Sequence, residues 1–269
     1  MAPVTLEPVS RTLDEPPLPA SSSGGSRTGR ILREVALLAF LFLVYNAGRF
    51  MSAKHAGAAF THADELIHLQ TQLGLPSETD VQHAALRIPH LAQAANRYYA
   101  AVHFPLTALV LAWLLIRRPA AYPRARWSMA ALTGLALIGH LIFPLAPPRM
   151  LPQDGWVDTG VLLGQSVYGP TTDSGVANQF AAMPSLHVGW ALMVAVFLIR
   201  HTSSRWRWLW IAHPVITFAV VVVTANHYWL DGLIATALAA PLLLLLRTSP
   251  ARRRYGSSSR PPAAAPLPK

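Results

Sequence analysis

Two polar side chains that suit nucleophilic or acid–base chemistry open one of the most apolar stretches of the chain. His227 and Asp231 lie four residues apart in TANHYWLDGL, residues 224–233. This spacing places them on one face of a helix, within reach of each other. A carboxylate bonded to one imidazole nitrogen fixes the tautomer and leaves the other nitrogen free as a nucleophile or base. The spacing therefore predicts a histidine held ready for reaction.

A second pair stands where another apolar run begins, in AAMPSLHVGW at 181–190. Proline suits the first position of a helix, so Pro184 predicts that Ser185 and His187 lie in a first helical turn. The free N–H groups and the positive dipole end of such a turn favour an anion, notably a phosphate. An ordinary helix start that happens to carry polar residues remains the alternative.

A third polar group is Arg149, which follows another apolar run in FPLAPPRM at 143–150. Taken alone, this arginine also fits a simple interfacial anchor. With two histidines and one aspartate at neighbouring helix ends, it completes a set for phosphoryl transfer: a nucleophile, an orienting carboxylate, an acid and a positive clamp. The same two histidines and aspartate also match a facial metal triad, which stays open at this point.

The elements that must position these residues are membrane helices. The chain has 269 residues, of which 52% are hydrophobic and only 13% charged, a composition typical of a polytopic membrane protein. We expect an all-α bundle of six transmembrane helices with further helices in extracytoplasmic loops. Apolar runs of suitable length fall at roughly 31–48, 98–116, 127–144, 185–200, 208–225 and 228–246. Small residues within them, Gly134, Gly139, Gly189 and Ala191, predict close helix packing.

The arginines indicate how these helices are oriented. With six spans, one side collects Arg27, Arg30, Arg33, Arg117, Arg118, Arg124, Arg126, Arg200, Arg205, Arg207, Arg247, Arg252, Arg253 and Arg254. The positive-inside rule makes that side, with both termini, cytoplasmic. This accounts for the net charge of +10 without a nucleic-acid partner. The candidate site then faces outward, beside two long loops at 49–97 and 145–184, the first with helical stretches at 62–75 and 81–99.

Composition also sets the domain limits. Residues 1–29 and 248–269 are rich in Pro, Ser, Gly or Arg and are expected to be disordered cytoplasmic tails. The membrane domain takes residues 30–247. The first apolar run lacks a cleavage site, which predicts an uncleaved first helix. There is no cysteine, which excludes disulfides and thiolate metal sites.

The motifs together resemble a known family. PSLH at 184–187 and NHYWLD at 226–231 are similar to the second and third signature motifs of the type 2 phosphatidic acid phosphatase superfamily. With FPLAPPR and ANRYYAAVHFP (95–105), they look like its inositolphosphotransferase branch, similar to inositol phosphorylceramide synthases and their bacterial relatives. The resemblance covers roughly residues 31–246.

The resemblance implies a role for each site residue. His227 would form a phosphohistidine, Asp231 would orient it, and His187 would protonate the leaving oxygen. Ser185 and Arg149 would hold phosphate oxygens, and the family uses no metal and no soluble cofactor. The sequence departs from the usual motifs, since Phe143 and Met150 stand where a Lys and a Pro are usual, and VVVVTAN (220–226) has no Arg. Candidates for the missing cations are Lys54, Arg87 and Arg97.

Other polar residues lie near the same helix ends. His103, with Tyr99 and Asn96 just before it, is predicted to line a substrate entrance, whereas His140 is expected to be a bonded core residue. The chain is thus interpreted as a multi-pass enzyme of a bacterial plasma membrane, acting on lipid phosphates, diphosphates or phospholipid headgroups. The competing non-enzyme hypothesis is a transporter or flippase of lipid-linked phosphates, although a transporter would be expected to place its charges near the membrane midplane.

Overall fold

The computed structural model describes residues 27–52, 56–166 and 180–245. Within these ranges the regular elements are helices joined by loops, with no strand, which confirms the all-α prediction. The expected tails, apart from residues 27–29, which belong to the first helix, lie outside the described residues, as do Lys54 and part of the 145–184 loop. The helices are α1 (Arg27–Ser52), α2 (Ala56–Gln72), α3 (Glu78–Leu86), α4 (Leu91–Ala101), α5 (His103–Arg117), α6 (Tyr122–Ile142), α7 (Thr159–Leu162), α8 (Leu186–His201), α9 (Ala212–Val223) and α10 (Trp229–Leu245). Three 3₁₀ segments, η1 (Pro148–Met150), η2 (Pro152–Asp154) and η3 (Arg205–Ile211), join them.

The chain divides into two units, residues 1–40 and 41–269, and each is described by itself. The described part of the first unit is the beginning of α1. The second unit holds α2 to α10 and all of the predicted site residues. The helices predicted at 62–75 and 81–99 are present there as α2, α3 and α4.

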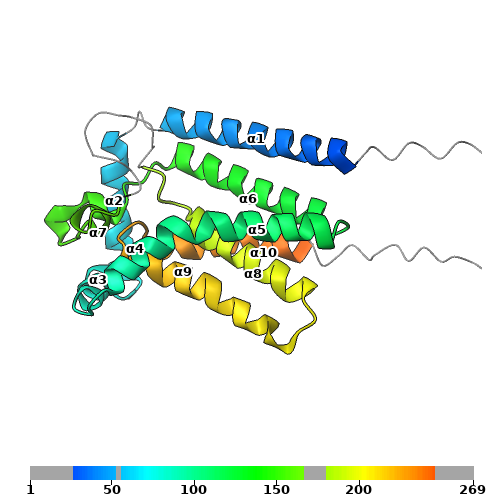
Figure 1. The fold of residues 1–269 in the computed structure, drawn as a ribbon. Helices are drawn as coiled ribbons and strands as arrows, with labels where there is room; N and C mark the ends of the chain where they lie inside the picture. Colours follow the sequence, from blue (N-terminus) through cyan, green and yellow to red (C-terminus); the bar gives the residue numbers. More distant parts are fainter. Residues whose placement is uncertain (1–26, 53–55, 167–179, 246–269) are drawn as a thin grey trace, which may run out of the picture. The chain divides into compact units, whose positions relative to one another are not determined.

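Within the second unit, α5, α6, α8, α9 and α10 pack along one another (Figure 1). The shorter helices gather at one end of this bundle: α3 and α4 pack on α9, α7 on α4, and α2 on α10. At that end α8 and α10 begin and α9 finishes. The geometry therefore brings the PSLH and NHYWLD segments to the same end of the bundle, against α2, α3 and α4.

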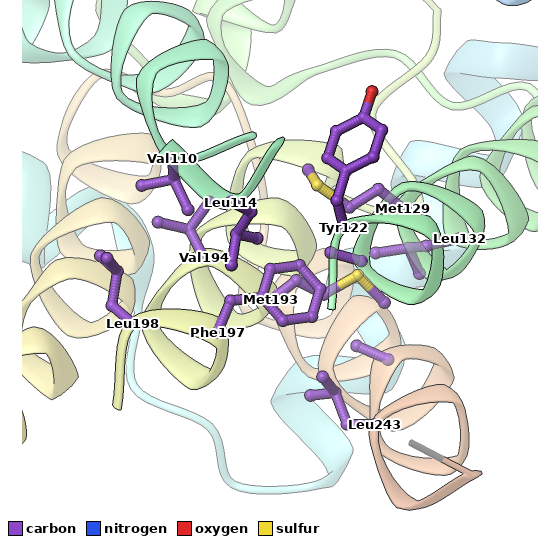
Figure 2. Packing of buried hydrophobic residues seen from close by; sticks show 12 residues of the cluster. Val110, Leu114, Tyr122, Met129, Leu132, Met193, Val194, Phe197, Leu198 and Leu243 are labelled. Carbon is purple, nitrogen blue, oxygen red and sulfur yellow. The ribbon is translucent and has the colours of Figure 1, made fainter. Parts of the chain in front are cut away.

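The core of the bundle is a cluster of aliphatic, methionine and aromatic side chains from α5, α6, α8 and α10 (Figure 2). Glycines bring these helices close. A Cβ on Gly189 would lie 2.8 Å from Leu132 Cδ2, and one on Gly232 would lie 2.5 Å from the Phe218 ring. Gly139 contacts Pro184 in the same way, whereas Gly134 has open space around it. The predicted close packing thus holds at Gly139 and Gly189 but not at Gly134.

Two described helices are long and apolar enough to cross a membrane: α6, and the continuous helix Arg205–Val223 formed by η3 and α9. The pair α4 and α5, bent by 41°, makes a third if it is one span. The apolar α8 has only 16 residues, about 24 Å of helix against a hydrocarbon layer of about 30 Å. The chain is a helical membrane protein, and the count of six spans stays a prediction.

Candidate active site

His227 lies in the turn between α9 and α10, with its ring buried. Its Nδ1 is 2.8 Å from the carbonyl oxygen of Ala182 and 3.3 Å from Asp231 Oδ2. A carbonyl oxygen only accepts hydrogen bonds, so Nδ1 must carry the proton and Nε2 must keep its lone pair. Burial and, to a smaller extent, the charge of Arg149 together lower the pKa of His227 to about 4, against the opposing effect of the Ala182 carbonyl. The imidazole is therefore neutral at pH 7 and has one free nitrogen.

Asp231 is fully buried in the first turn of α10. Its Oδ2 accepts the Tyr228 N–H at 2.9 Å as well as the His227 Nδ1–H. Its Oδ1 has no hydrogen-bond partner among the described residues. A buried carboxylate that is only half satisfied is costly, and such groups in membrane helices usually serve function. The predicted His227–Asp231 contact is present, but the Ala182 carbonyl makes the shorter bond to the imidazole.

His187 faces His227 from the first turn of α8, with 5.7 Å between the two ring centroids. Its ring stacks on Tyr99 at 4.4 Å and lies 4.6 Å from the ring of His103. These contacts fix the plane of the His187 ring. The two imidazoles are therefore neighbours at this end of the bundle, one from α8 and one from the turn before α10.

Ser185 corrects one sequence expectation. It is the N-cap of α8 rather than a first-turn residue, and its Oγ accepts the Val188 N–H at 3.5 Å. Its own N–H donates to the backbone carbonyl of Asp231 at 3.0 Å, which ties the beginning of α8 to the beginning of α10. This backbone hydrogen bond holds the PSLH and NHYWLD segments together.

Arg149 is the only buried Lys or Arg side chain among the described residues. Its backbone N–H donates to the carbonyl oxygen of Ala225, two residues before His227, at 2.8 Å, and its Nε lies 4.0 Å from Asp158 Oδ2. The segment before it is fixed from two sides. His62 of α2 bonds to the Pro144 carbonyl at 2.8 Å, and Tyr228 donates to the Ala146 carbonyl at 3.0 Å.

A small cavity of about 10 Å³ adjoins Arg149 and is lined also by Tyr99, Asp158 and Asn226. This is room for about one water-sized sphere. The hollow thus touches both the His187 side of the site, through Tyr99, and the His227 side, through Asn226. A phosphate needs more space than this, so substrate binding requires the surrounding side chains to move apart.

The sequence did not single out Gln70 and Glu78, which hold the beginning of α10. Glu78 Oε1 accepts the Trp229 N–H at 2.9 Å, and Gln70 Oε1 accepts the Leu230 N–H at 3.0 Å. With Asp231 on the Tyr228 N–H, three successive backbone donors are satisfied by side chains from α2, α3 and α10 itself. Burial raises the pKa of Glu78 above its ordinary value. An acidic residue within a polar outer loop carries no local signal of this distant contact.

The residues predicted to line an entrance are buried rather than open. His103 and Asn96 are 2% and 5% exposed. Asn96 exchanges two 3.0 Å hydrogen bonds with Thr159, so it fastens α4 to α7. Tyr99 and His103 instead pack against His187. His140 is buried and bonds to the Pro184 carbonyl at 3.3 Å, in agreement with the core role expected for it.

Neither of the described candidates for the missing cations makes a contact with the site residues that the structure records. Arg87 and Arg97 are exposed, and Lys54 lies outside the described residues. Among the described residues, no three His, Asp or Glu side chains are grouped as metal ligands would be. The facial-triad alternative therefore has no ligand set there, and Nδ1 of His227 is already engaged with Ala182.

These features define a class: a helical membrane protein with two facing imidazoles, a buried carboxylate and a buried arginine at one end of its bundle. A family model described as the PAP2 superfamily matches residues 64–245, more than half of the chain, and the chain belongs to that superfamily. It is accordingly a phosphoesterase-type membrane enzyme, of a superfamily that acts on phosphorylated, lipid-type substrates. The match supports membership of the superfamily but does not assign the chain to the inositolphosphotransferase branch. No curated protein and no solved structure matches the chain.

Proposed function

We propose that the protein is an integral-membrane lipid phosphatase or phosphotransferase that forms a phosphohistidine on His227. One observation carries this: the Ala182 carbonyl, 2.8 Å from Nδ1, leaves Nε2 of His227 as the free nitrogen, while the His187 ring lies 5.7 Å away. The pKa of about 4 keeps His227 unprotonated at neutral pH. A neutral imidazole is the nucleophilic form.

In the first half-reaction, Nε2 of His227 attacks the phosphorus of a lipid phosphate ester. The phosphorus–oxygen bond to the leaving group breaks, and His187, in its protonated form, donates a proton to the departing oxygen. A phosphate anion between the two rings favours that protonated form. Arg149 and the Ser185 hydroxyl bind the non-bridging oxygens, and Arg149 balances their negative charge. Asp231 stabilises the positive charge that the His227 ring acquires.

In the second half-reaction, a water or alcohol oxygen attacks the phosphohistidine. The nitrogen–phosphorus bond breaks, the attacking group gives its proton to His187, and both imidazoles return to their starting state. Water yields inorganic phosphate, and an alcohol yields a new phosphate ester. The inositolphosphotransferase-like form of this proposal uses a phospholipid headgroup as donor and a lipid alcohol such as ceramide as acceptor.

We place this chemistry on the extracytoplasmic face of a bacterial plasma membrane, with both termini cytoplasmic. The distribution of the arginines carries this part of the proposal. Reporter fusions at the C-terminus test it: activity of a cytoplasmic reporter is the expected result. If only a reporter that works on the extracytoplasmic side is active at the C-terminus, the proposed orientation is wrong and the site lies on the cytoplasmic face.

The decisive experiment compares wild type, His227→Ala and the control His68→Ala in detergent. His68 is an exposed histidine of α2, so its loss should leave turnover intact. Lipid phosphates, lipid diphosphates and phospholipids with ceramide are offered as substrates, with and without EDTA, and phosphate release and headgroup transfer are measured separately. We expect His227→Ala to abolish both, and radiolabelled phosphate to be trapped as an acid-labile adduct on wild type and His68→Ala but not on His227→Ala.

Turnover by His227→Ala at the level of the control would refute the phosphohistidine. Full loss of activity with EDTA would favour the metal site instead. After reconstitution into lipid vesicles, transbilayer movement of a labelled lipid phosphate without any release, equal in wild type and His227→Ala, would favour a flippase. His187→Ala gives a further check, because a substrate with a good leaving group needs little proton donation and should partly restore the first step.

A further inference from the structure

The end of the bundle opposite to the candidate active site carries a groove lined by arginines. It has a volume of about 380 Å³, and Arg117, Arg118, Arg124 and His201 contribute to its walls. It lies where α5 finishes, α6 begins and α8 finishes. None of these side chains takes part in the site around His227.

The groove is a full helix length from that site. His103 and His187 belong to the first turns of α5 and α8, whereas Arg117 and His201 are their last residues. At 1.5 Å per residue, the 14 or 15 residues between these ends correspond to about 21 Å. In Figure 1, α5 and α8 finish at the end of the bundle away from α2 and α3. The groove is therefore separate from the catalytic end.

Its positive charge has no internal counter-ion in the surrounding helices. The sequence contains no Asp or Glu from residue 81 to residue 153, nor from residue 174 to residue 230. Consequently α5, α6, α8 and η3 carry no acidic side chain. Arg118 donates to the backbone carbonyl of His201 at 3.3 Å, which links α5 to α8 but adds no negative charge. Guanidinium groups held together repel one another unless an anion lies between them.

The position of the groove in the bundle indicates what kind of anion would balance these arginines. Ile116 and Trp127, close in sequence to Arg117 and Arg124, are 62% and 52% exposed, and the Arg126 guanidinium lies 4.9 Å from the Trp127 ring centroid. Apolar and aromatic side chains at the ends of membrane helices lie at the level of lipid headgroups and upper acyl chains. Arginine forks match the oxygens of a phosphate. The ligand should thus bear both a phosphate and an acyl chain.

We propose that this groove binds the phosphate of an anionic phospholipid, at the end of the bundle opposite to His227. Basic pockets between membrane helices are suited to such headgroups. The bound lipid bridges α5, α6 and α8 and supplies the counter-charge that these helices lack. The proposal is independent of the reaction proposed above, because it uses none of the same residues.

The test measures lipid binding to the full chain carrying His227→Ala, so that turnover cannot interfere. Native mass spectrometry or tryptophan fluorescence follows titration with short-chain phosphatidylglycerol, phosphatidylcholine of equal chain length, and inorganic phosphate. The pair Arg117→Gln/Arg124→Gln is compared with Arg205→Gln/Arg207→Gln, which removes the same charge from two arginines of η3 that lie over their own Trp neighbours.

We expect phosphatidylglycerol to bind more tightly than the other two probes. Each lost arginine should weaken it about fivefold, so the groove pair should lose about 25-fold while the η3 pair stays close to the parent. Equal loss in both pairs would mean a diffuse surface potential and would overturn the proposal. So would equal affinity for phosphatidylcholine, or full competition by inorganic phosphate at the same concentration. If the double variant does not fold, Arg124→Gln alone should still show the fivefold loss.

Discussion

Glu78 offers a sharp test of how the catalytic turn is positioned. Its Oε1 accepts the Trp229 N–H at 2.9 Å, two residues after His227. Glu78→Ala leaves that N–H without its acceptor, and Glu78→Gln keeps an oxygen in the same place. Leaving a donor unsatisfied costs about 1–3 kcal/mol when it is buried. Because Trp229 is only partly buried, we expect about 1–2 kcal/mol for the alanine variant, in line with the loss of a helix cap.

This cost should reach the reaction as well as stability. The first turn of α10 carries Asp231 and follows His227 directly, so a loosened turn misplaces the nucleophile in the transition state. If about 1.4 kcal/mol of the lost stabilisation is added to the activation free energy, kcat falls about tenfold. The effect on KM should be small, since Glu78 contacts none of the residues proposed to bind phosphate. Glu78→Gln should keep kcat near the wild-type value.

The glutamine variant also has a pH signature. Burial raises the pKa of Glu78 in the folded protein, so the folded state binds a proton more tightly than the unfolded chain. The contribution of Glu78 to stability is therefore complete below its ordinary pKa of 4.5 and is lost as the pH rises through the raised value. Glu78→Gln removes this loss. Its unfolding midpoint should match or exceed that of wild type at pH 7 and converge with it in acid.

The assay combines kcat, KM and the thermal unfolding midpoint in detergent, with Glu65→Ala on the exposed face of α2 as the matched control. A lowered midpoint with an unchanged kcat in Glu78→Ala would show that Glu78 only stabilises the fold. Equal damage in the alanine and glutamine variants would show that the charge, rather than the hydrogen-bond acceptor, matters. Either result would refute the positioning argument.

The remaining predictions concern the turn and the packing of α10. Because the pKa of His227 is about 4 and its unprotonated form is the proposed nucleophile, the acid-side loss of kcat/KM that reports His227 should be centred near pH 4; a loss centred near 6.5 would contradict the burial of the ring. Asp231→Asn should lower kcat by about 10- to 100-fold, less than the roughly 10⁴-fold seen when a tautomer is lost, because the Ala182 carbonyl still holds Nδ1–H; a larger loss would assign the tautomer to Asp231. Gly232→Ala should lower the unfolding midpoint by an amount equivalent to about 1–3 kcal/mol, since its Cβ would come within 2.5 Å of an aromatic ring of α9, whereas Gly134→Ala, with open space around it, should not.

Much of the fold could be predicted because local sequence patterns determine where the helices form. The apolar runs became helices, and the mixed-polarity stretches of the first long loop became α2, α3 and α4. The predicted contact of His227 with Asp231 is present, but His227 lies in the turn before α10, so helical periodicity alone does not fix that distance. The Pro184 signal located the beginning of α8 to within two residues. It misplaced Ser185, because cap geometry depends on which N–H groups remain free.

The working state of the site was decided only by the tertiary structure. The proton on His227 Nδ1 is held by the carbonyl of Ala182, 45 residues away, and the direction of a backbone carbonyl in a loop has no sequence signature. Glu78 and Gln70 reach α10 across 151 and 160 residues. Periodicity carries no information over such separations, because these bonds form only when α2, α3 and α10 are already packed. The sequence by itself therefore determined which residues share a helix end, and the packing determined which atom of His227 is free to react.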